Sequence, residues 1–311
     1  MLLSLVVPCF NEEGNVFRFF GEVKKAFNER KEQLEFVFID DGSKDKTFEN
    51  LRKLFDENPS ENIQVISFSR NFGKEAAMYA GLSHARGDLV CIIDADLQQR
   101  PEVVAEMLDI LENDSDTDCV AAYQSDRKEG KFISFSKALF YKIINKMTDV
   151  EFVSGASDFR LMRRNMVDAV LSMTEYHRFS KGIFSFVGFN TEYIPYTAAE
   201  RESGQSKWGF KKLMKYALEG IMAFSTAPLK LSLWLGVISL VAALICLITA
   251  FFAPDIFSYA AAVVLTLLLG GLILVSSGIL GAYLSKIYIE VKKRPVYIIK
   301  SHLRREENGK N

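Results

Sequence analysis

The chain has 311 residues, more than one average domain of about 150 residues, which predicts two structural units. Its net charge of -1 conceals a division, because residues 201–311 carry 14 Lys and Arg against 6 Asp and Glu, whereas residues 1–200 carry 24 against 33. The acidic front part argues against nucleic acid as its partner, and the basic rear part favours an anionic membrane surface. The four cysteines stand singly in apolar runs, so neither a disulfide framework nor a zinc site is predicted.

Residues 1–125 alternate short apolar runs with longer amphipathic ones. Strands are predicted at 2–7, 35–39, 63–68, 88–93 and 119–123, and the segments between them, such as 16–27 and 102–111, have helical spacing. The apolar start lacks a basic leader, so we interpret it as a buried strand rather than a secretory signal. The alternation indicates an α/β fold with a parallel sheet covered on both faces, where ligands gather at the carboxyl ends of the strands.

Residues 126–200 are less regular. A helix is predicted at 132–147, a patch of Gly, Ser and Asp follows at 154–158, and a strand-like run occupies 188–195. This segment therefore predicts fewer regular elements than the first 125 residues.

The last third contains two long uncharged runs. There are 24 residues between Lys230 and Asp255 and 30 between Asp255 and Lys286, and each run exceeds the roughly 20 residues that cross a bilayer core. Two membrane helices are predicted at 231–252 and 259–285, within an anchor at 229–286. Lys and Arg flank the pair but are missing from the turn between its helices, so both flanks are expected in the cytoplasm. The alternative is a buried helical hairpin of a soluble protein.

Two further segments border this pair. Residues 207–228 are basic and amphipathic and are predicted to lie in the membrane interface, although a surface helix has the same pattern. The tail at 287–311 contains a predicted strand at 295–299 that could add to a neighbour's sheet in a homo-oligomer.

The strongest chemical signal is an acidic pair at the end of the fourth predicted strand. Asp94 and Asp96 are two residues apart, and in extended backbone such residues point the same way, so both carboxylates can face one hard divalent cation. Gln98 lies two residues further on and could add a neutral oxygen ligand. Magnesium or manganese held there would neutralise charge on a departing diphosphate. The ordinary alternative is that two acidic residues at a strand end are solvated or cap a helix.

Acidic residues also follow the first two predicted strands. Asp40 and Asp41 end the second strand, where Asp41 could accept hydrogen bonds from a nucleobase or a ribose. Helix capping is the alternative for this loop. Glu12 follows the first strand, so three strand ends carry carboxylates on one edge of the sheet.

Three motifs stand at these strand ends: Val7-Pro8-Cys9-Phe10-Asn11-Glu12-Glu13, Ile39-Asp40-Asp41-Gly42-Ser43 with Asp45 and Thr47, and Asp94-Ala95-Asp96-Leu97-Gln98 with Pro101-Glu102. With these motifs the chain resembles the family 2 glycosyltransferases with a GT-A fold that charge polyprenyl phosphates, a group that includes dolichol-phosphate mannose synthases and bactoprenol-phosphate glucosyltransferases. The resemblance covers the whole chain and implies a Rossmann-like, mixed, mainly parallel sheet in a cytoplasmic catalytic domain at 1–206, with a two-helix membrane anchor.

The resemblance also implies roles for individual residues. Nucleotide contacts are implied at Pro8, Phe10, Glu12, Ile39 and Asp41, although Phe10 replaces the Tyr often found there. Metal or diphosphate contacts are implied at Asp94, Ala95, Asp96 and Gln98. The basic positions Arg127, Arg201 and Lys207 are implied to bind phosphate, with Gly204 letting their loop close, while Lys207 has membrane-surface charge as its alternative. Ser136 is a candidate contact to the acceptor phosphate.

Asp158 matches the position that the bactoprenol relatives use as the catalytic base. Because a phosphate monoester is already ionised near neutral pH, Asp158 could instead orient the sugar or the acceptor. Arg160 could pair with this carboxylate.

The predicted function is inverting transfer of a hexose, with UDP-glucose as the first choice of donor, to undecaprenyl or another polyprenyl phosphate at the cytoplasmic face of the inner membrane. N-acetylhexosamine, mannose and aminoarabinose donors stay open, and Mg²⁺ or Mn²⁺ is the expected cofactor. A processive polysaccharide synthase is disfavoured, because Gln205-Ser206-Lys207-Trp208 lacks the Gln-x-x-Arg-Trp pattern of such enzymes. A membrane scaffold that binds nucleotide sugars without catalysis is the third hypothesis.

Overall fold

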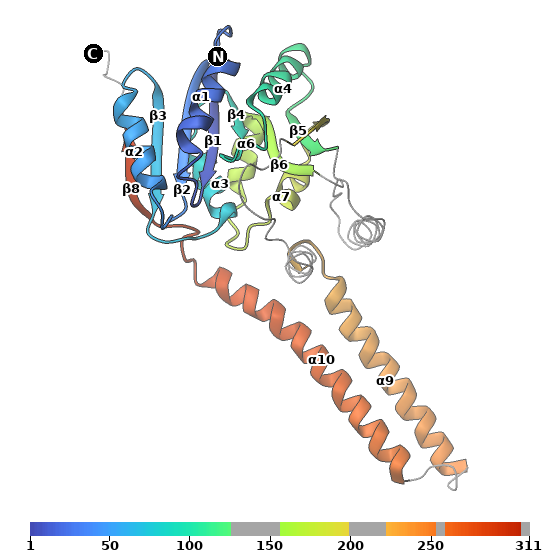
Figure 1. Ribbon diagram of the computed structural model, residues 1–311. Helices are drawn as coiled ribbons and strands as arrows, with labels where there is room; N and C mark the ends of the chain where they lie inside the picture. The colour runs from blue at the N-terminus through green and yellow to red at the C-terminus, as the bar shows by residue number, and fades with distance from the viewer. Residues whose placement is uncertain (126–155, 199–221, 253–258, 306–311) are drawn as a thin grey trace. The chain divides into compact units, whose positions relative to one another are not determined.

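The computed structural model describes residues 1–125, 156–198, 222–252 and 259–305 (Figure 1). Within them the chain forms two compact units, one containing the sheet together with residues 295–305, and the other containing the two long apolar helices. The helix predicted at 132–147 and most of the interfacial segment lie outside the described residues.

The first unit is built on one sheet of eight described strands in the order β7-β5-β6-β4-β1-β2-β3-β8. Neighbours pair in parallel from β4 through β1 and β2 to β3 and between β5 and β7, whereas β6 is antiparallel to both β4 and β5. The predicted α/β class with a mixed, mainly parallel sheet is therefore confirmed. The strands are β1 Leu2–Cys9, β2 Gln33–Asp40, β3 Asn62–Phe68, β4 Leu89–Ile92, β5 Cys119–Gln124, β6 Ala156–Arg163, β7 Thr191–Tyr196 and β8 Ile299–Arg304.

Helices cover both faces of this sheet (Figure 1). On one face α1 packs beside α2 and α4, and their apolar stripes join a core that includes Phe19, Phe36 and Phe38. On the other face α3 packs on β1 and β2 and beside α6. The helices of this unit are α1 Val16–Ala26, α2 Thr47–Glu57, α3 Lys74–His84, α4 Pro101–Asn113, α6 Arg164–Ser172 and α7 Ser180–Phe186.

Close approach of α3 to β1 depends on Gly81. A Cβ added to Gly81 would lie 2.1 Å from Cγ1 of Val6, far inside van der Waals contact. Any larger residue would push α3 away from the sheet. Since the amino end of α3 carries residues of the candidate site described below, this glycine helps to set the position of that end.

Glu35 can be buried because the polar groups of Ser4, Gln64 and Arg86 donate hydrogen bonds to its carboxylate. Its side chain is 0% exposed and accepts hydrogen bonds from the Ser4 hydroxyl, from Gln64 Nε2 at 2.8 Å, and from Nε and the backbone N–H of Arg86, each at 2.8 Å. Burial raises the pKa of Glu35, but these donors more than offset it, so the pKa lies below its ordinary value. The network ties β1, β2 and β3 to the end of α3.

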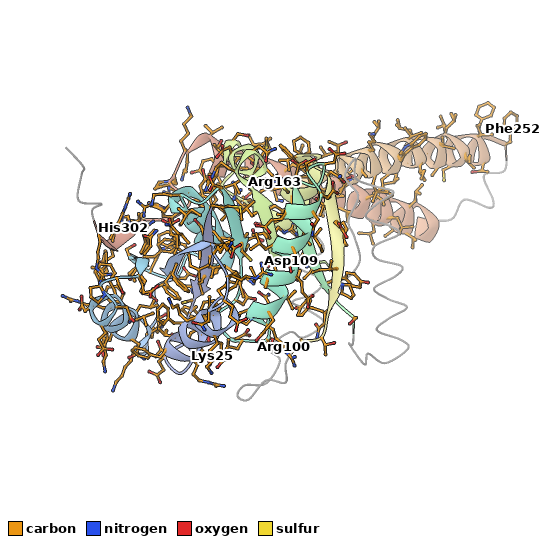
Figure 2. The ribbon with its side chains drawn as sticks, turned by 90° about the horizontal axis from the view of Figure 1, so that it is seen from above. Lys25, Arg100, Asp109, Arg163, Phe252 and His302 are labelled. Atoms are coloured by element: carbon orange, nitrogen blue, oxygen red, sulfur yellow. The ribbon has the colours of Figure 1, made fainter. Side chains whose placement is uncertain are left out.

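The C-terminal strand lies further along the chain than the sequence predicted. Residues Ile299–Arg304, rather than 295–299, form β8, which pairs antiparallel with β3 of its own chain (Figure 1). His302 on β8 lies edge-on to His84 of α3, with ring centroids 5.2 Å apart, and is labelled in Figure 2. The tail thus pairs with its own sheet, and β8 is the last strand of that sheet on this side.

The second unit contains α9, Ala227–Phe252, and α10, Tyr259–Val291, which pack against each other. Both are long and apolar enough to cross a membrane, and their large side chains are exposed, as Leu233 at 69% and Leu274 at 74% illustrate. Apolar surface of this extent is unfavourable in water. The two predicted apolar helices are therefore present, and each extends beyond its predicted limits.

We expect Glu35→Ala to lower the free energy of unfolding by about 3 kcal/mol, because Arg86 and Gln64 lose a buried acceptor. Thermal or urea unfolding of the full chain in detergent measures this change. The control is Glu57→Ala, which removes a 56% exposed carboxylate 3.7 Å from Lys53 and should change stability by less than about 0.5 kcal/mol. Equal losses in both variants would contradict the assigned role of Glu35.

Candidate functional site

Acidic residues from three strand ends meet around Cys9 at the carboxyl edge of the sheet. Cys9 is 1% exposed and stands opposite Asp40 in the β1–β2 register. Burial raises the pKa of the Cys9 thiol, and the negative charges of Glu12, Asp40, Asp94 and Asp45 raise it further. These carboxylates follow β1, β2 and β4, so the predicted convergence of strand ends is present in the fold.

The loops after β1 and β2 are joined to each other by hydrogen bonds. The Asn11 N–H donates to Ser43 Oγ at 3.0 Å, and its side-chain oxygen accepts the Lys44 N–H at 2.9 Å. The Glu12 N–H donates to Thr47 Oγ1 at 2.7 Å. Asn11 takes a left-handed backbone conformation with φ of 57°, which asparagine tolerates better than most residues. These hydrogen bonds fix the direction in which both loops leave the sheet.

Asp41 holds a third loop, the one between β3 and α3. Its 3% exposed carboxylate accepts the Phe72 N–H at 2.6 Å and the Gly73 N–H at 2.9 Å. Burial raises the pKa of Asp41, and these two bonds lower it in part. Gly42 makes the contact possible, because it has φ of 64° and any Cβ would lie 2.4 Å from the backbone of Arg70. The implied nucleotide contact of Asp41 stays a prediction.

The acidic pair after β4 lies on a turn rather than on extended backbone. β4 ends at Ile92, residues 95–96 turn, and Leu97 is left-handed with φ of 59°. The extended geometry assumed for Asp94 and Asp96 is therefore wrong. Gln99 supports the turn, since it accepts the Asp94 N–H at 2.8 Å and donates to the Asp94 carboxylate at 3.1 Å.

Asp96 accepts the backbone N–H of Gln98 at 3.1 Å, which closes the next step of the turn. Glu12 belongs to the same electrostatic neighbourhood: burial raises its pKa, and the charges of Asp96 and Asp94 raise it further while Asn15 lowers it. The donor set for a cation is thus two turn carboxylates beside other acids. Among the described residues, no group of three or more His, Cys, Asp or Glu side chains could hold a metal by itself.

Asp158 lies close to Asp94, because β6 is the antiparallel neighbour of β4. The strand pairing ends at Ile92 of β4 and Arg160 of β6, and Asp94 follows Ile92 by two residues while Asp158 precedes Arg160 by two. Between them lies Lys74, the first residue of α3, with Nζ 2.7 Å from Asp94 and 3.4 Å from Asp158. One cation therefore bridges two carboxylates that come from different parts of the chain.

Positive charge keeps Asp158 ionised although it is largely buried. Burial raises the pKa of this carboxyl, but Lys74, Lys181 and Arg160 more than offset it, so the pKa lies below its ordinary value. Burial likewise lowers the pKa of Lys74, and the charges of Asp94 and Asp158 raise it above its ordinary value. Arg160 donates to the Ser157 carbonyl at 3.0 Å and stacks on Phe184 at 3.7 Å. The Arg160 charge helps to lower the pKa of Asp158, and a direct ion pair between the two side chains stays a prediction.

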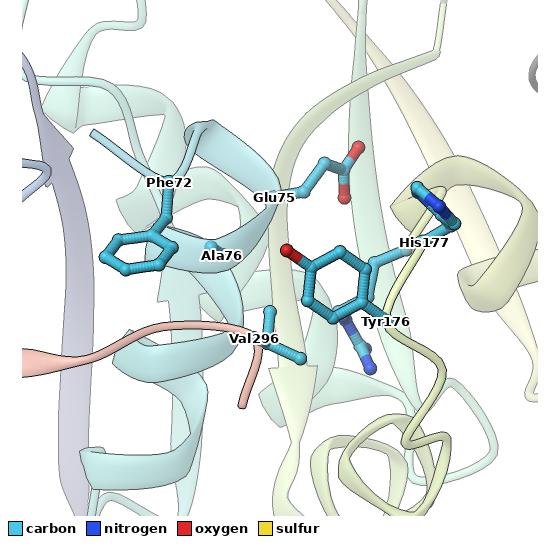
Figure 3. Close-up of a pocket in the computed structure, with 7 residues that line it drawn as sticks. Phe72, Glu75, Ala76, Tyr176, His177 and Val296 are labelled. Atoms are coloured by element: carbon cyan, nitrogen blue, oxygen red, sulfur yellow. The ribbon is translucent and has the colours of Figure 1, made fainter. Parts of the chain in front are cut away.

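A cavity of about 190 Å³ opens next to this cluster (Figure 3). Its wall includes Glu75, which follows Lys74 on α3 and accepts hydrogen bonds from the N–H and hydroxyl of Ser180 at the start of α7. Burial and the charge of Asp158 raise the pKa of Glu75 to about 7. Phe72, Ala76, Tyr176, His177, Arg178 and Val296 complete the wall.

The other predicted site residues differ in their access to solvent. Phe10 is 43% exposed, and Pro8 is half-buried. Ile39 is 0% exposed and Ala95 is 2% exposed, so their side chains face the core and only their backbone could meet a ligand. The remaining candidates, Arg127, Ser136, Arg201, Gly204 and Lys207, lie outside the described residues.

Lys74 and Gln99 are the residues that sequence reasoning missed. Lys74 belongs to the loop-to-helix segment after β3, whose carboxyl end lies at the same sheet edge as those of β1, β2 and β4. The rule that ligands gather at the carboxyl ends of parallel strands applied to this end too. Inspection of all four ends would have identified Lys74.

Residues 4–171 match the family described as Glycosyl transferase family 2. The chain belongs to this family and is a glycosyltransferase. It is 40% identical over 306 residues to the prophage bactoprenol glucosyl transferase homolog of Escherichia coli, and the alignment covers 96% of this chain and 99% of that protein. It is 40% identical to the bactoprenol glucosyl transferase of Shigella phage SfV, with 97% and 99% covered.

A relative from Synechocystis, known as an uncharacterized glycosyltransferase, is 38% identical, with 96% of this chain and 94% of that protein covered. Among solved structures, the mannosyltransferase PcManGT of Pyrobaculum calidifontis in complex with GDP-Man and Mn²⁺ has a TM-score of 0.46 at 17% identity, covering 93% and 84%. Mannosyl-3-phosphoglycerate synthase of Rubrobacter xylanophilus has a TM-score of 0.48 at 18% identity, covering 72% of each chain.

We expect Glu75→Gln to be more stable than the parent protein at pH 8 and equally stable near pH 4.5. The pKa of Glu75 is raised from 4.5 to about 7 in the folded state, so the parent loses stability as the pH rises through this window, whereas glutamine stays neutral and still accepts from Ser180. Unfolding curves between pH 4.5 and 8 measure the difference. The exposed control Glu112→Gln should follow the parent at every pH, and a Glu75→Gln curve parallel to the parent would contradict the assignment.

Proposed function

We propose that this glycosyltransferase transfers a hexose, with glucose from UDP-glucose as the first choice, to undecaprenyl or another polyprenyl phosphate. The observation that carries the proposal is the 40% identity to proteins named bactoprenol glucosyl transferases over 96–97% of the chain, which includes both apolar helices. The proposal is also supported by Asp158, whose pKa lies below its ordinary value and whose carboxylate lies beside Lys74 and Asp94, where it could orient a substrate.

The donor diphosphate is expected at Asp94 and Asp96. Two carboxylates can hold Mg²⁺ or Mn²⁺ when water molecules and substrate phosphates complete the shell. A bound divalent cation would neutralise the charge that develops on the leaving diphosphate. Pro8, Phe10, Glu12, Ile39 and Asp41 are the proposed nucleotide-side residues, with backbone contacts at Ile39.

The reaction is a direct displacement. An oxygen of the lipid phosphate attacks the anomeric carbon, the bond to the nucleoside diphosphate breaks, and the configuration inverts. The attacking phosphate is already ionised near neutral pH, so it needs little help from a base. Asp158, fixed by Lys74, is therefore proposed to orient the sugar or the acceptor, and any proton on the acceptor phosphate would pass to this carboxylate.

The acceptor is itself an anion, so it needs cations to approach an acidic sheet edge. Arg127, Arg201 and Lys207 are the proposed phosphate ligands, because guanidinium groups bind phosphate oxygens in pairs and lysine adds a point charge. Ser136 is proposed to donate a hydrogen bond to the same phosphate.

We expect Asp96→Ala to lower sugar transfer to undecaprenyl phosphate by at least about a hundredfold, because the diphosphate loses its cation support. The assay uses purified full-length protein, Mn²⁺ and a panel of UDP-glucose, UDP-N-acetylglucosamine, GDP-mannose and UDP-aminoarabinose, with the lipid product identified by mass. UDP-glucose should give the fastest turnover.

Asp168→Ala is the matched control. Asp168 is 65% exposed, and among the described residues its one ion pair, with Arg164 on the same helix, is loose at 3.9 Å. Its activity should equal that of the parent. Full turnover by Asp96→Ala would remove the metal assignment, and turnover with another donor alone would replace glucose in the proposal.

Membrane orientation follows from the flanking charges. Lys and Arg surround the helix pair and are missing from residues 253–258 between them, so the catalytic domain and both termini are proposed to be cytoplasmic.

Asp255→Cys should react with a membrane-impermeant maleimide in intact cells, whereas Lys310→Cys should react only after permeabilisation. The reverse labelling pattern would contradict this orientation.

A further inference from the structure

Lys74 resolves a conflict between two neighbouring carboxylates. Its ammonium contacts both of them, with Nζ 2.7 Å from Asp94, just after β4, and 3.4 Å from Asp158 on the adjacent strand β6. Two like charges this close to a single cation repel each other. Because Asp158 is 19% exposed and its Oδ1 has no hydrogen-bond partner among the described residues, solvent does little to relieve the repulsion.

The bridge is built to exchange one of its partners. Lys74 is 43% exposed and Asp94 is 30% exposed, so water reaches the pair. A lysine has a flexible four-carbon stem and a compact charge, and it can leave one carboxylate while staying near another. Gln99 Nε2 also donates to the Asp94 carboxylate, at 3.1 Å, and its side-chain oxygen accepts the Asp94 N–H at 2.8 Å, so Asp94 keeps its position when the ammonium moves.

We propose that Lys74 is a positioning residue that holds Asp94 beside Asp158 in the metal-free protein and gives up Asp94 when a divalent cation binds there. The inference rests on the proposed metal site at Asp94 and Asp96. It adds that two cations compete for one carboxylate, so Lys74 weakens metal binding in the absence of donor. The cost of displacing Lys74 makes the site selective for a cation that arrives with a diphosphate.

The test is Mn²⁺ binding without nucleotide, measured on the full chain in detergent by the electron paramagnetic resonance signal of free Mn²⁺. Lys74→Met should bind Mn²⁺ at least about fivefold more tightly than the parent, the size of effect that one partly exposed ion pair supplies. Lys74→Arg retains the charge and should bind as the parent does. Lys53→Met, which removes a 63% exposed lysine from α2, should also match the parent.

A merely structural Lys74 gives the opposite result. If Lys74 only supports folding, Lys74→Met loosens Asp94 and binds Mn²⁺ no better than the parent, and that outcome overturns the proposal. Should Lys74→Met fail to fold, the comparison moves to Asp158→Asn with and without Lys74→Met, because removal of one negative charge also removes the need for the bridge. The doubly substituted protein should still bind Mn²⁺ more tightly than Asp158→Asn alone, and equal affinities overturn the proposal.

The same assay separates this inference from the proposed function. Asp96→Ala should abolish Mn²⁺ binding whatever Lys74 does, so unchanged binding by Asp96→Ala removes the metal site itself. Loss of binding in Asp96→Ala together with unchanged affinity in Lys74→Met removes only the competition between Lys74 and the metal.

Discussion

Repulsion between Asp94 and Asp158 is the constraint on which the site depends. The antiparallel insertion of β6 beside β4 brings these two carboxylates together, and the first residue of α3 supplies the opposite charge that makes the arrangement stable. The position of α3 is set in turn by its contact with β1 at Gly81 and by Asp41, which holds the preceding loop. Sheet register, helix placement and charge balance are therefore parts of one arrangement.

Buried carboxylates at the two ends of the strands differ in how completely their hydrogen-bonding capacity is satisfied. Near the end of α3, Glu35 has a full set of donors, so its charge is stabilised and fixed. At the carboxyl edge, Asp158 retains an oxygen without a hydrogen-bond partner among the described residues, and Asp94 shares the ammonium of Lys74 with Asp158. A fully satisfied charge contributes to stability, whereas an incompletely satisfied one is available to a ligand. The acidic edge is thus where substrate binding gains most.

Local patterns predicted strands β1 to β5 and β7, missed the antiparallel β6 and placed the C-terminal strand too early. Strands β1 to β4 have continuous apolar runs flanked by amphipathic helices, which periodicity detects. β6 carries Asp158 and Arg160 on one side and the buried Phe159 and Leu161 on the other, and its start overlaps the predicted patch of Gly, Ser and Asp at 154–158, so no long apolar run identified it as a strand. Strand-end acids were predictable for the same local reason. Lys74 also follows a strand end, but its two partners were not predictable, because they are 20 and 84 residues away and meet it only in the folded chain.

Charge balance explains why two anionic substrates need added positive charge at this edge. A nucleoside diphosphate and a lipid phosphate are both anions, and the edge that would receive them already holds Glu12, Asp94, Asp96 and Asp158. The charges of Lys74, Lys181 and Arg160 already compensate Asp158. The proposed divalent cation at Asp94 and Asp96 would neutralise the diphosphate, and the proposed ligands Arg127, Arg201 and Lys207 would neutralise the acceptor, because unpaired charges at a partly buried edge are costly to assemble. An acidic edge is therefore compatible with a reaction between two anions only when cations accompany the substrates.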